Sequence, residues 1–143
     1  MICLMTLSAL SQQAEYVDLG LPSGTLWKSK NEKGKYYTYE KAMRKYGSQM
    51  PTWLQFRELK ACCTWTWNGS GYTVKGNNIV LPAVGYRTDY GRLKFVGTDG
   101  FYWSSNPCGE FYVWILCFGS RDIDISNFGI FSGLSVRLVK NTK

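Results

Sequence analysis

Cysteine is the residue type in this 143-residue sequence that is best suited to covalent chemistry. Of the five cysteines, only Cys108 and Cys117 could form the reactive pair of an oxidative enzyme, and no neighbouring cation or histidine would lower the pKa of either thiol. None has the C-x-x-C spacing of a zinc or redox motif, and free cysteine more often fills apolar space. Histidine, the commonest metal ligand and general base, is absent. The sequence therefore predicts a protein that is not an enzyme and needs no cofactor.

Calcium is the metal ion that the remaining oxygen ligands could bind. A calcium site needs about six to eight oxygen ligands, with carboxylates among them. Ser105 and Asn106 lie together but without a carboxylate, while Asp122 and Asp124 occupy alternate positions of a predicted strand, where side chains more often project into water. We therefore expect no required calcium.

The net charge of +7 is concentrated near the N-terminus. Residues 28–45 contain seven cations but only two carboxylates, Glu32 and Glu40. These cations are Lys28, Lys30, Lys33, Lys35, Lys41, Arg44 and Lys45. We interpret them as a solvated basic face rather than a nucleic-acid site. No stretch is long and apolar enough to insert into a membrane, so neither nucleic acid nor membrane is an expected partner.

Length and composition indicate one globular domain. A chain of this size fits one domain, and 16% aromatic with only 19% charged residues favours a packed core over disorder. We expect an N-terminal arm over residues 1–15 and a domain over residues 16–143. The arm lacks the basic start of a secretory signal, which favours a packed arm or contact helix.

Two helices are expected in the first half of the chain. Thr38 can cap a helix over residues 39–46, with Gly47 as its C-terminal stop. Thr52 and Gln55 form a T-x-x-Q capping box that opens a second helix.

The second half of the chain is mainly β. Residues 114–118 and 123–127 predict an antiparallel pair that turns through residues 119–122. A first strand over residues 16–19 should lie beside a last strand through residues 135–138. Two helices packed on irregular antiparallel sheets make an α+β domain.

Four segments resemble the Fibrobacter major paralogous domain family of gut bacteria and their phages. They are YVDLGLPSGTLW, LPAVGYR, FYWSS and GLSVRLV, and the resemblance runs from about residue 16 to residue 140. It implies a C-type-lectin-like fold with joined terminal strands, two helices and a loop-bearing sheet. The chain departs from longer members between Lys28 and Tyr39, where the usual insertion is short.

Some members of that family are variable proteins of diversity-generating retroelements, which rewrite a C-terminal coding region by mutating template adenines. Mutated AAY codons yield only NNY codons, which cannot encode Lys, Glu, Gln, Met or Trp. Residues 115–139 contain none of these five types in 25 positions, whereas residues 1–114 contain 28. The resemblance therefore places a variable region at about residues 108–132.

The predicted strand pair divides into a regular inner face and a mixed outer face. The inner face consists of Trp114, Leu116, Phe118, Ile123 and Ile125. The candidate ligand-binding residues are Cys108, Phe111, Tyr112, Ile115, Cys117, Gly119, Arg121, Asp122, Asp124, Ser126, Phe128, Gly129, Ile130 and Phe131.

Among these candidates, an exposed apolar patch is expected to have a polar rim. The expected patch is Phe111, Tyr112, Ile115, Phe128, Ile130 and Phe131, and the expected rim is Arg121, Asp122 and Asp124. The alternative is a purely structural one, in which an ordinary strand pair has an apolar loop that folds into the core.

The predicted function is non-enzymatic binding of a protein or cell-surface ligand. The resemblance implies a phage tail or a bacterial cell surface as its location, and an oligomer is possible. The main alternative is an undiversified surface or adhesin domain of the same fold.

The codons of the gene provide a first test. If six of the candidate residues descend from AAY codons, each of their codons should end in C or T. These residues are Ile115, Gly119, Arg121, Ser126, Gly129 and Ile130. Sequencing the locus should also find a near-identical adenine-rich template and a reverse transcriptase gene beside it. Codons such as ATA, GGA or AGA at several of these positions would refute retroelement ancestry for them.

Overall fold

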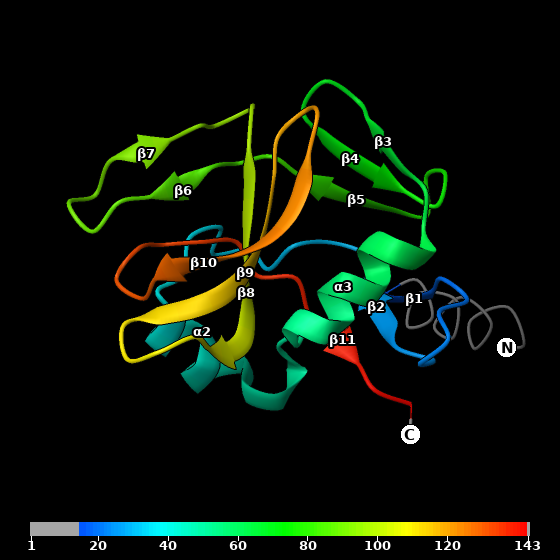
Figure 1. Cartoon of the computed structure of the whole chain (residues 1–143), viewed down its shortest axis with the longest axis horizontal. Helices are drawn as coiled ribbons and strands as arrows, with labels where there is room; N and C mark the ends of the chain where they lie inside the picture. Colours follow the sequence, from blue (N-terminus) through cyan, green and yellow to red (C-terminus); the bar gives the residue numbers. More distant parts are fainter. Residues whose placement is uncertain (1–14, 143) are drawn as a thin grey trace, which may run out of the picture.

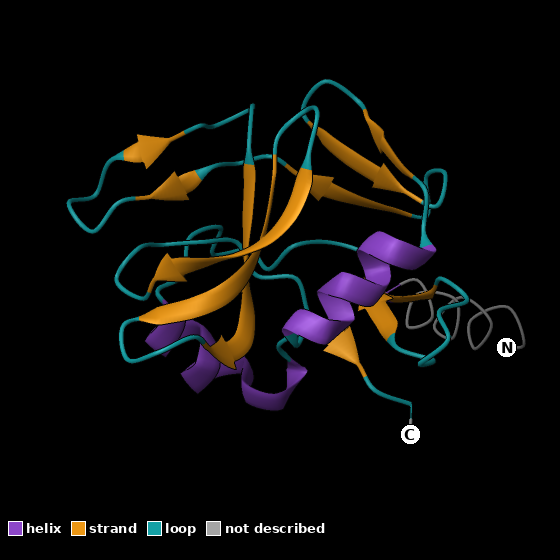
Figure 2. Cartoon of the chain, viewed as in Figure 1, coloured by secondary structure: helices purple, strands orange, loops and turns teal. Residues whose placement is uncertain are grey.

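The computed structural model of this chain describes residues 15–142, which fold into two α-helices and several antiparallel sheets. The predicted α+β class is therefore confirmed. Figure 2 shows both helices in the lower half of the view, with sheets above and beside them. The predicted arm over residues 1–15 lies outside the described residues except for Glu15. No helix of the described part is long and apolar enough to cross a membrane.

The first helix, α2 (Tyr39–Tyr46), begins and ends as its sequence predicts. The Thr38 side chain accepts a hydrogen bond from a first-turn amide, and Gly47 ends the helix with a positive φ of 49°. A short 3-10 turn, η1 (Gly47–Gln49), then leads the chain toward the second helix.

The second helix, α3 (Trp53–Cys62), has the predicted capping box. The Thr52 hydroxyl accepts from the Gln55 amide at 3.1 Å, and the Gln55 side chain accepts from the Thr52 amide at 2.9 Å. Phe56 and Leu59 are buried and anchor the helix against the large sheet.

The strands form three three-stranded sheets and one hairpin. The terminal sheet has the order β1 (Tyr16–Asp18), β2 (Leu26–Lys28) and β11 (Val139–Lys140). The second sheet has the order β3 (Trp65–Trp67), β4 (Gly71–Val74) and β5 (Ile79–Pro82), and the hairpin pairs β6 (Tyr86–Arg87) with β7 (Leu93–Lys94). Figure 1 shows the β6–β7 hairpin at the upper left and the β3–β5 sheet at the upper right. The large sheet has the order β10 (Ile123–Gly129), β9 (Tyr112–Phe118) and β8 (Gly100–Pro107).

The terminal strands share a sheet, but the predicted adjacency was wrong. β2 lies between β1 and β11 and pairs with both, Trp27 standing opposite Val17 on one side and Val139 on the other. The last strand also begins further along the chain than predicted. Residues 135–138 form an irregular buried segment whose backbone makes hydrogen bonds to several elements. Leu138 O, for example, accepts from the amide of Lys28.

β9 is the central strand of the large sheet, and a hydrophobic core lies on each of its faces. Leu116 and Phe118 pack into the core that contains Trp27, Phe56 and the second sheet. Val113 and Ile115 pack into a second core with Trp103, α2 and the segment before β11. A central strand covered on both faces has no side available for solvent.

A buried arginine joins three of these elements. Arg137, only 1% exposed, donates from Nη1 to Lys28 O at 3.1 Å, from Nε to Asn31 Oδ1 at 2.8 Å, and from Nη2 to Val80 O. Burial lowers the pKa of this guanidinium. Its charge is thus stabilised by oxygen acceptors of β2, of the loop after it and of β5.

The same network extends to the large sheet. Asn31 Nδ2 donates to the Tyr102 hydroxyl at 2.9 Å, and that hydroxyl donates to Pro82 O at 2.7 Å. Burial raises the pKa of Tyr102 to about 12, so the phenol remains a donor at neutral pH. β8 is thereby tied to β5 and to the loop that follows β2.

Trp103 offers a test of the second core. Its side chain is 0% exposed, and its Nε1 donates to Tyr37 O at 2.6 Å. Trp103→Ala should lower the free energy of unfolding by about 3–5 kcal/mol, through the cavity and the unpaired carbonyl. Trp114→Ala should lower it less, because Trp114 is only partly buried. Equal losses in urea denaturation would contradict this view of the core.

Candidate ligand-binding face

The hairpin of β9 and β10 holds most of the candidate residues, and it has the predicted register. Phe118 lies opposite Ile123, and Trp114 lies opposite Asn127. The Gly119 amide donates to Asp122 O at 3.1 Å, which closes the predicted turn. The pairing and the turn over residues 119–122 are confirmed.

The candidate residues fall into three classes of exposure. Those exposed are Phe111, Tyr112, Arg121, Asp122, Asp124, Ser126 and Phe131. Those partly buried are Cys108, Cys117, Gly119, Phe128, Gly129 and Ile130. Ile115 alone among them is buried, at 1% exposure, so its prediction as a solvent-facing residue was wrong. It stands beside Trp103 in the register and packs in the second core, because both faces of β9 are covered.

An apolar surface forms where the hairpin ends. The Ile130 amide donates to Phe111 O at 3.1 Å, and Tyr112 lies opposite Gly129, so the start of β9 is held against the end of β10. Phe131 follows and is 64% exposed. We name this the apolar surface. It comprises Phe111, Tyr112, Phe128, Ile130 and Phe131.

The base of the apolar surface is half-buried rather than free. The Phe128 ring lies 4.8 Å from that of Tyr86 and 5.5 Å from that of Phe101, measured between ring centroids. Phe128 and Ile130 pack against the second core. The alternative in which this loop folds wholly into the core is therefore wrong for Phe131, which is exposed. Phe128 and Ile130 are only partly buried in the core.

The β6–β7 hairpin adds a second set of exposed apolar residues that the sequence analysis missed. Tyr90 at its tip is 91% exposed, and Leu93, Phe95 and Val96 are also exposed. Tyr86 connects them to Phe128, since its ring lies 6.2 Å from that of Phe95. The available signal was the turn over residues 88–92, whose Asp89 and Gly91 are residue types typical of a hairpin turn.

Two backbone features position this hairpin. Gly85 has a φ of +64°, and a Cβ there would lie 2.8 Å from Val96 N, so only glycine fits. Phe95 also has a left-handed backbone, with a φ of +59°, which costs roughly 1–2 kcal/mol in a non-glycine residue. Its carbonyl accepts hydrogen bonds from the amides of Thr98 and Asp99, which hold this conformation.

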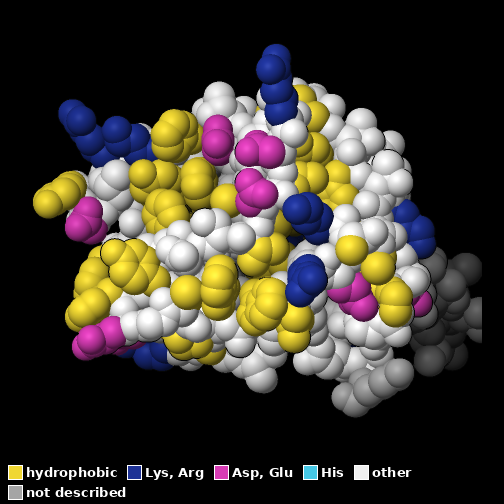
Figure 3. Space-filling view, viewed as in Figure 1, with side chains coloured by type: hydrophobic (Ala, Val, Ile, Leu, Met, Phe, Trp, Pro, Cys, Tyr) yellow, Lys and Arg dark blue, Asp and Glu magenta, His cyan; other side chains and the backbone are white. Residues whose placement is uncertain are grey.

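The predicted polar rim lies elsewhere. Arg121, Asp122 and Asp124 are at the turn of the β9–β10 hairpin, whereas Phe131 follows its open end. At about 3.4 Å per residue, β10 separates the two ends by roughly 20 Å. Figure 3 shows hydrophobic side chains over much of the left of the view, with one group of acidic side chains in the upper middle and others at the left edge. The turn and the apolar surface are therefore separate regions of one side of the molecule.

The two candidate cysteines do not form a reactive pair. The Cys108 amide donates to Tyr112 O at the start of β9, and Cys117 lies five residues beyond Tyr112, about 16 Å away along the strand. Burial raises the pKa of Cys117 to about 11, with further contributions from Asp124 and Asp122, so its thiol is not a nucleophile at neutral pH. Within residues 15–142, no group of three His, Cys, Asp or Glu side chains is arranged to hold a metal ion.

Comparisons with known proteins find no match for the chain. No protein-family model matches it, and neither the curated proteins nor the solved structures contain a match. Its function must therefore be inferred from the geometry of its own surface.

Ile115 and Ser126 test the division between core and exposed face. They are cross-strand neighbours on the same face of the sheet, yet Ile115 is buried and Ser126 is exposed. Ile115→Ala should cost about 2–5 kcal/mol in unfolding free energy, whereas Ser126→Ala should change it by less than about 0.5 kcal/mol. Comparable shifts of the two denaturation midpoints would mean that this face is not divided as described.

Proposed function

We propose that this protein is a non-enzymatic ligand-binding protein of C-type-lectin-like fold, and that its β9–β10 hairpin is the diversified face of a retroelement variable protein. The observation that carries the proposal is the apolar surface at the open end of this hairpin. Three of its aromatic side chains, those of Phe111, Tyr112 and Phe131, are exposed. Exposed aromatic side chains reduce solubility, and binding a partner is the usual reason for several of them at one end of a hairpin.

The architecture supports the fold part of the proposal. The chain brings its first and last strands into one sheet through β2, and it places two helices against an irregular set of antiparallel strands. These are the features that the resemblance implies. The segment GLSVRLV, one of the resembling motifs, supplies Arg137 and the buried stretch that joins the terminal sheet to the rest.

The hairpin also suits repeated change of sequence. Arg121, Asp122, Asp124 and Ser126 are exposed, and none of their side chains makes a hydrogen bond or ion pair with the described residues. Substitutions at such positions usually alter stability by less than about 0.5 kcal/mol. The Lys, Glu, Gln, Met and Trp residues that NNY codons cannot encode are all absent over residues 115–139.

One observation favours the undiversified alternative. Tyr90, Leu93, Phe95 and Val96 extend the exposed apolar area beyond the predicted variable region of residues 108–132. A fixed surface or adhesin domain would use such a constant patch together with the apolar surface. The two functions share the same ligand-binding side and differ in whether the β9–β10 residues vary.

A displayed library tests whether this face is a binding face. Exposed candidate positions would be randomised with NNY codons and selected against hen egg lysozyme as a probe. These positions are Phe111, Tyr112, Arg121, Asp122, Asp124, Ser126 and Phe131. Folded binders with Kd below about 1 μM are expected, since anchors in a permissive frame supply the affinity.

The control library randomises exposed positions on and just after α3, namely Leu54, Arg57, Lys60, Ala61 and Thr64. It should yield few binders, because most of these positions lie on a convex helix, whereas those of the first library lie on a hairpin and its adjoining loops. Equal yields from both libraries, or general unfolding of the first, would count against the proposed face.

A further inference from the structure

A cavity of about 720 Å³ lies beside α2, away from the proposed binding face. Its walls come from the loop over residues 28–37 and from one side of α2, and Glu15 lies at its edge. No candidate residue of the β9–β10 hairpin lines it. A volume in this range is typical of small-molecule sites rather than of gaps in packing.

The cavity has an excess of positive charge. Its lining includes five lysines but only two carboxylates, those of Glu15 and Glu32. Both carboxylates pair with Lys28, at 3.4 Å and 2.8 Å from its Nζ. Burial lowers the pKa of Lys28, but the hydrogen bond and charge of Glu32 outweigh burial and raise it overall. The four other lysines form no ion pair with any residue from 15 to 142. They are Lys30, Lys33, Lys41 and Lys45.

Two of these lysines converge on one ring. Lys41 and Lys45 are one helical turn apart on α2, and their Nζ atoms lie 6.0 Å and 5.9 Å from the centroid of the Tyr37 ring. Lys45 Nζ is also 5.5 Å from the Tyr46 ring. Like charges at this spacing repel, and neither lysine forms an ion pair with a carboxylate of the described residues. The aromatic faces stabilise the two cations, but their charge remains uncompensated.

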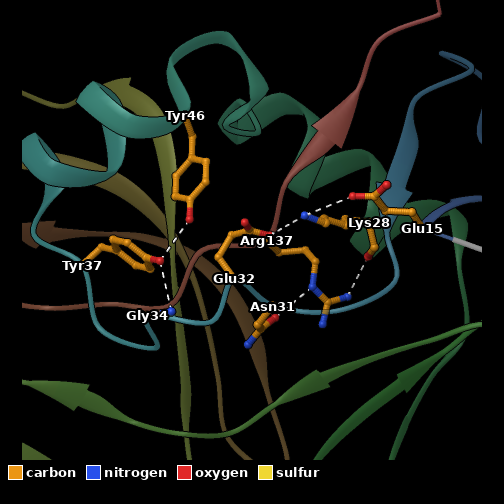
Figure 4. Close-up of polar contacts among 8 residues, drawn as sticks. All are labelled: Glu15, Lys28, Asn31, Glu32, Gly34, Tyr37, Tyr46 and Arg137. Carbon is orange, nitrogen blue, oxygen red and sulfur yellow. Dashed lines mark hydrogen bonds and ion pairs between the residues drawn. The ribbon is translucent and has the colours of Figure 1, made fainter. Parts of the chain in front are cut away.

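The tyrosines provide a fixed polar wall, which Figure 4 shows. The Tyr37 and Tyr46 hydroxyls are 3.0 Å apart, and the Gly34 amide donates to the Tyr37 hydroxyl at 3.0 Å. Burial, the hydrogen bond with Tyr37 and the nearby Glu32 carboxylate raise the pKa of Tyr46, so its hydroxyl keeps its proton at neutral pH. Tyr37 is buried, at 3% exposure, so the partly exposed Tyr46 ring supplies the aromatic surface of this wall.

The loop that forms the other wall is held in place from behind. Asn31 Oδ1 accepts from Arg137 Nε at 2.8 Å, and the Glu32 amide donates to Val136 O at 2.9 Å. Both contacts attach the loop to the buried segment before β11. The wall is preformed, so a ligand would not need to order it.

We propose that this cavity binds a small phosphate monoester on a sugar-sized ring, with the phosphate between Lys41 and Lys45 and the ring against Tyr46 and the loop over residues 28–37. A phosphate monoester carries a charge of about −1.5 to −2 at pH 7, which two ammonium groups match. Lysine binds phosphate as a point charge and does not require the planar geometry of arginine. A bare ion would leave most of the cavity unfilled, which favours a ligand with a ring. This site is independent of the proposed ligand-binding face.

The test is calorimetric titration of the whole chain with four probes: glucose 6-phosphate, glucose 6-sulfate, inorganic phosphate and glucose. Glucose 6-phosphate should bind in the millimolar range or tighter, at least about fivefold tighter than inorganic phosphate and than the monoanionic glucose 6-sulfate. Glucose should not bind. Equal affinity for the sulfate ester would overturn the assignment of a dianion, and equal affinity for inorganic phosphate would overturn the role of the tyrosine wall.

The double variant Lys41→Gln and Lys45→Gln should lose at least about tenfold in affinity for glucose 6-phosphate. Its melting temperature without ligand should be unchanged or higher, because a repulsive pair has been removed. The matched control, Lys60→Gln and Lys94→Gln, has the same net charge with both changes outside the cavity, and should bind as the wild type does. Failure of the wild type to bind glucose 6-phosphate at about 10 mM, or equal losses in the two double variants, would overturn the proposal.

Discussion

The buried guanidinium of Arg137 is the interaction on which the arrangement of this molecule depends. A cation that is removed from water must be given acceptors, and these come from β2, from the loop after it and from β5. Asn31 passes the network on to Tyr102, and Tyr102 ends it at Pro82. Since these acceptors belong to different segments, the charge is satisfied only when the terminal sheet and the second sheet are assembled, and Asn31 and Tyr102 connect the large sheet to the same network.

This assembly determines which residues can meet a ligand. β9 lies between β8 and β10, with a hydrophobic core on each face, so its middle residues are part of the framework. Exposure remains for the edge strand β10, for the turn after β9 and for the loop that contains Phe131. The β6–β7 hairpin projects beside them, and Tyr86 joins it to Phe128. In this arrangement the proposed ligand-binding side consists of the β6–β7 and β9–β10 hairpins, supported by a packed core.

The same framework leaves two surfaces with different chemistry. Aromatic side chains from Phe111 to Phe131 suit a protein or other partner with apolar area, where a few anchors supply most of the affinity. The lysines around Tyr37 and Tyr46 suit a small anion, for which charge and a preformed wall matter more. The loop of residues 28–37 is bonded to the segment before β11, which in turn reaches the core behind β9. The two surfaces are thus built on one core but share no lining residue.

The sequence by itself determined the elements that depend on local bonds. The caps at Thr38 and Thr52 and the register of β9 with β10 were predictable, because capping and short hairpins involve residues close in the chain. The exposure of Asp124 and Ser126 also followed from alternation. Only the tertiary structure decided that Ile115 is buried, that β2 separates the terminal strands, and that the lysines of α2 converge on Tyr37. Each of these depends on segments far apart in the chain, and alternation along one strand cannot show whether its second face is covered.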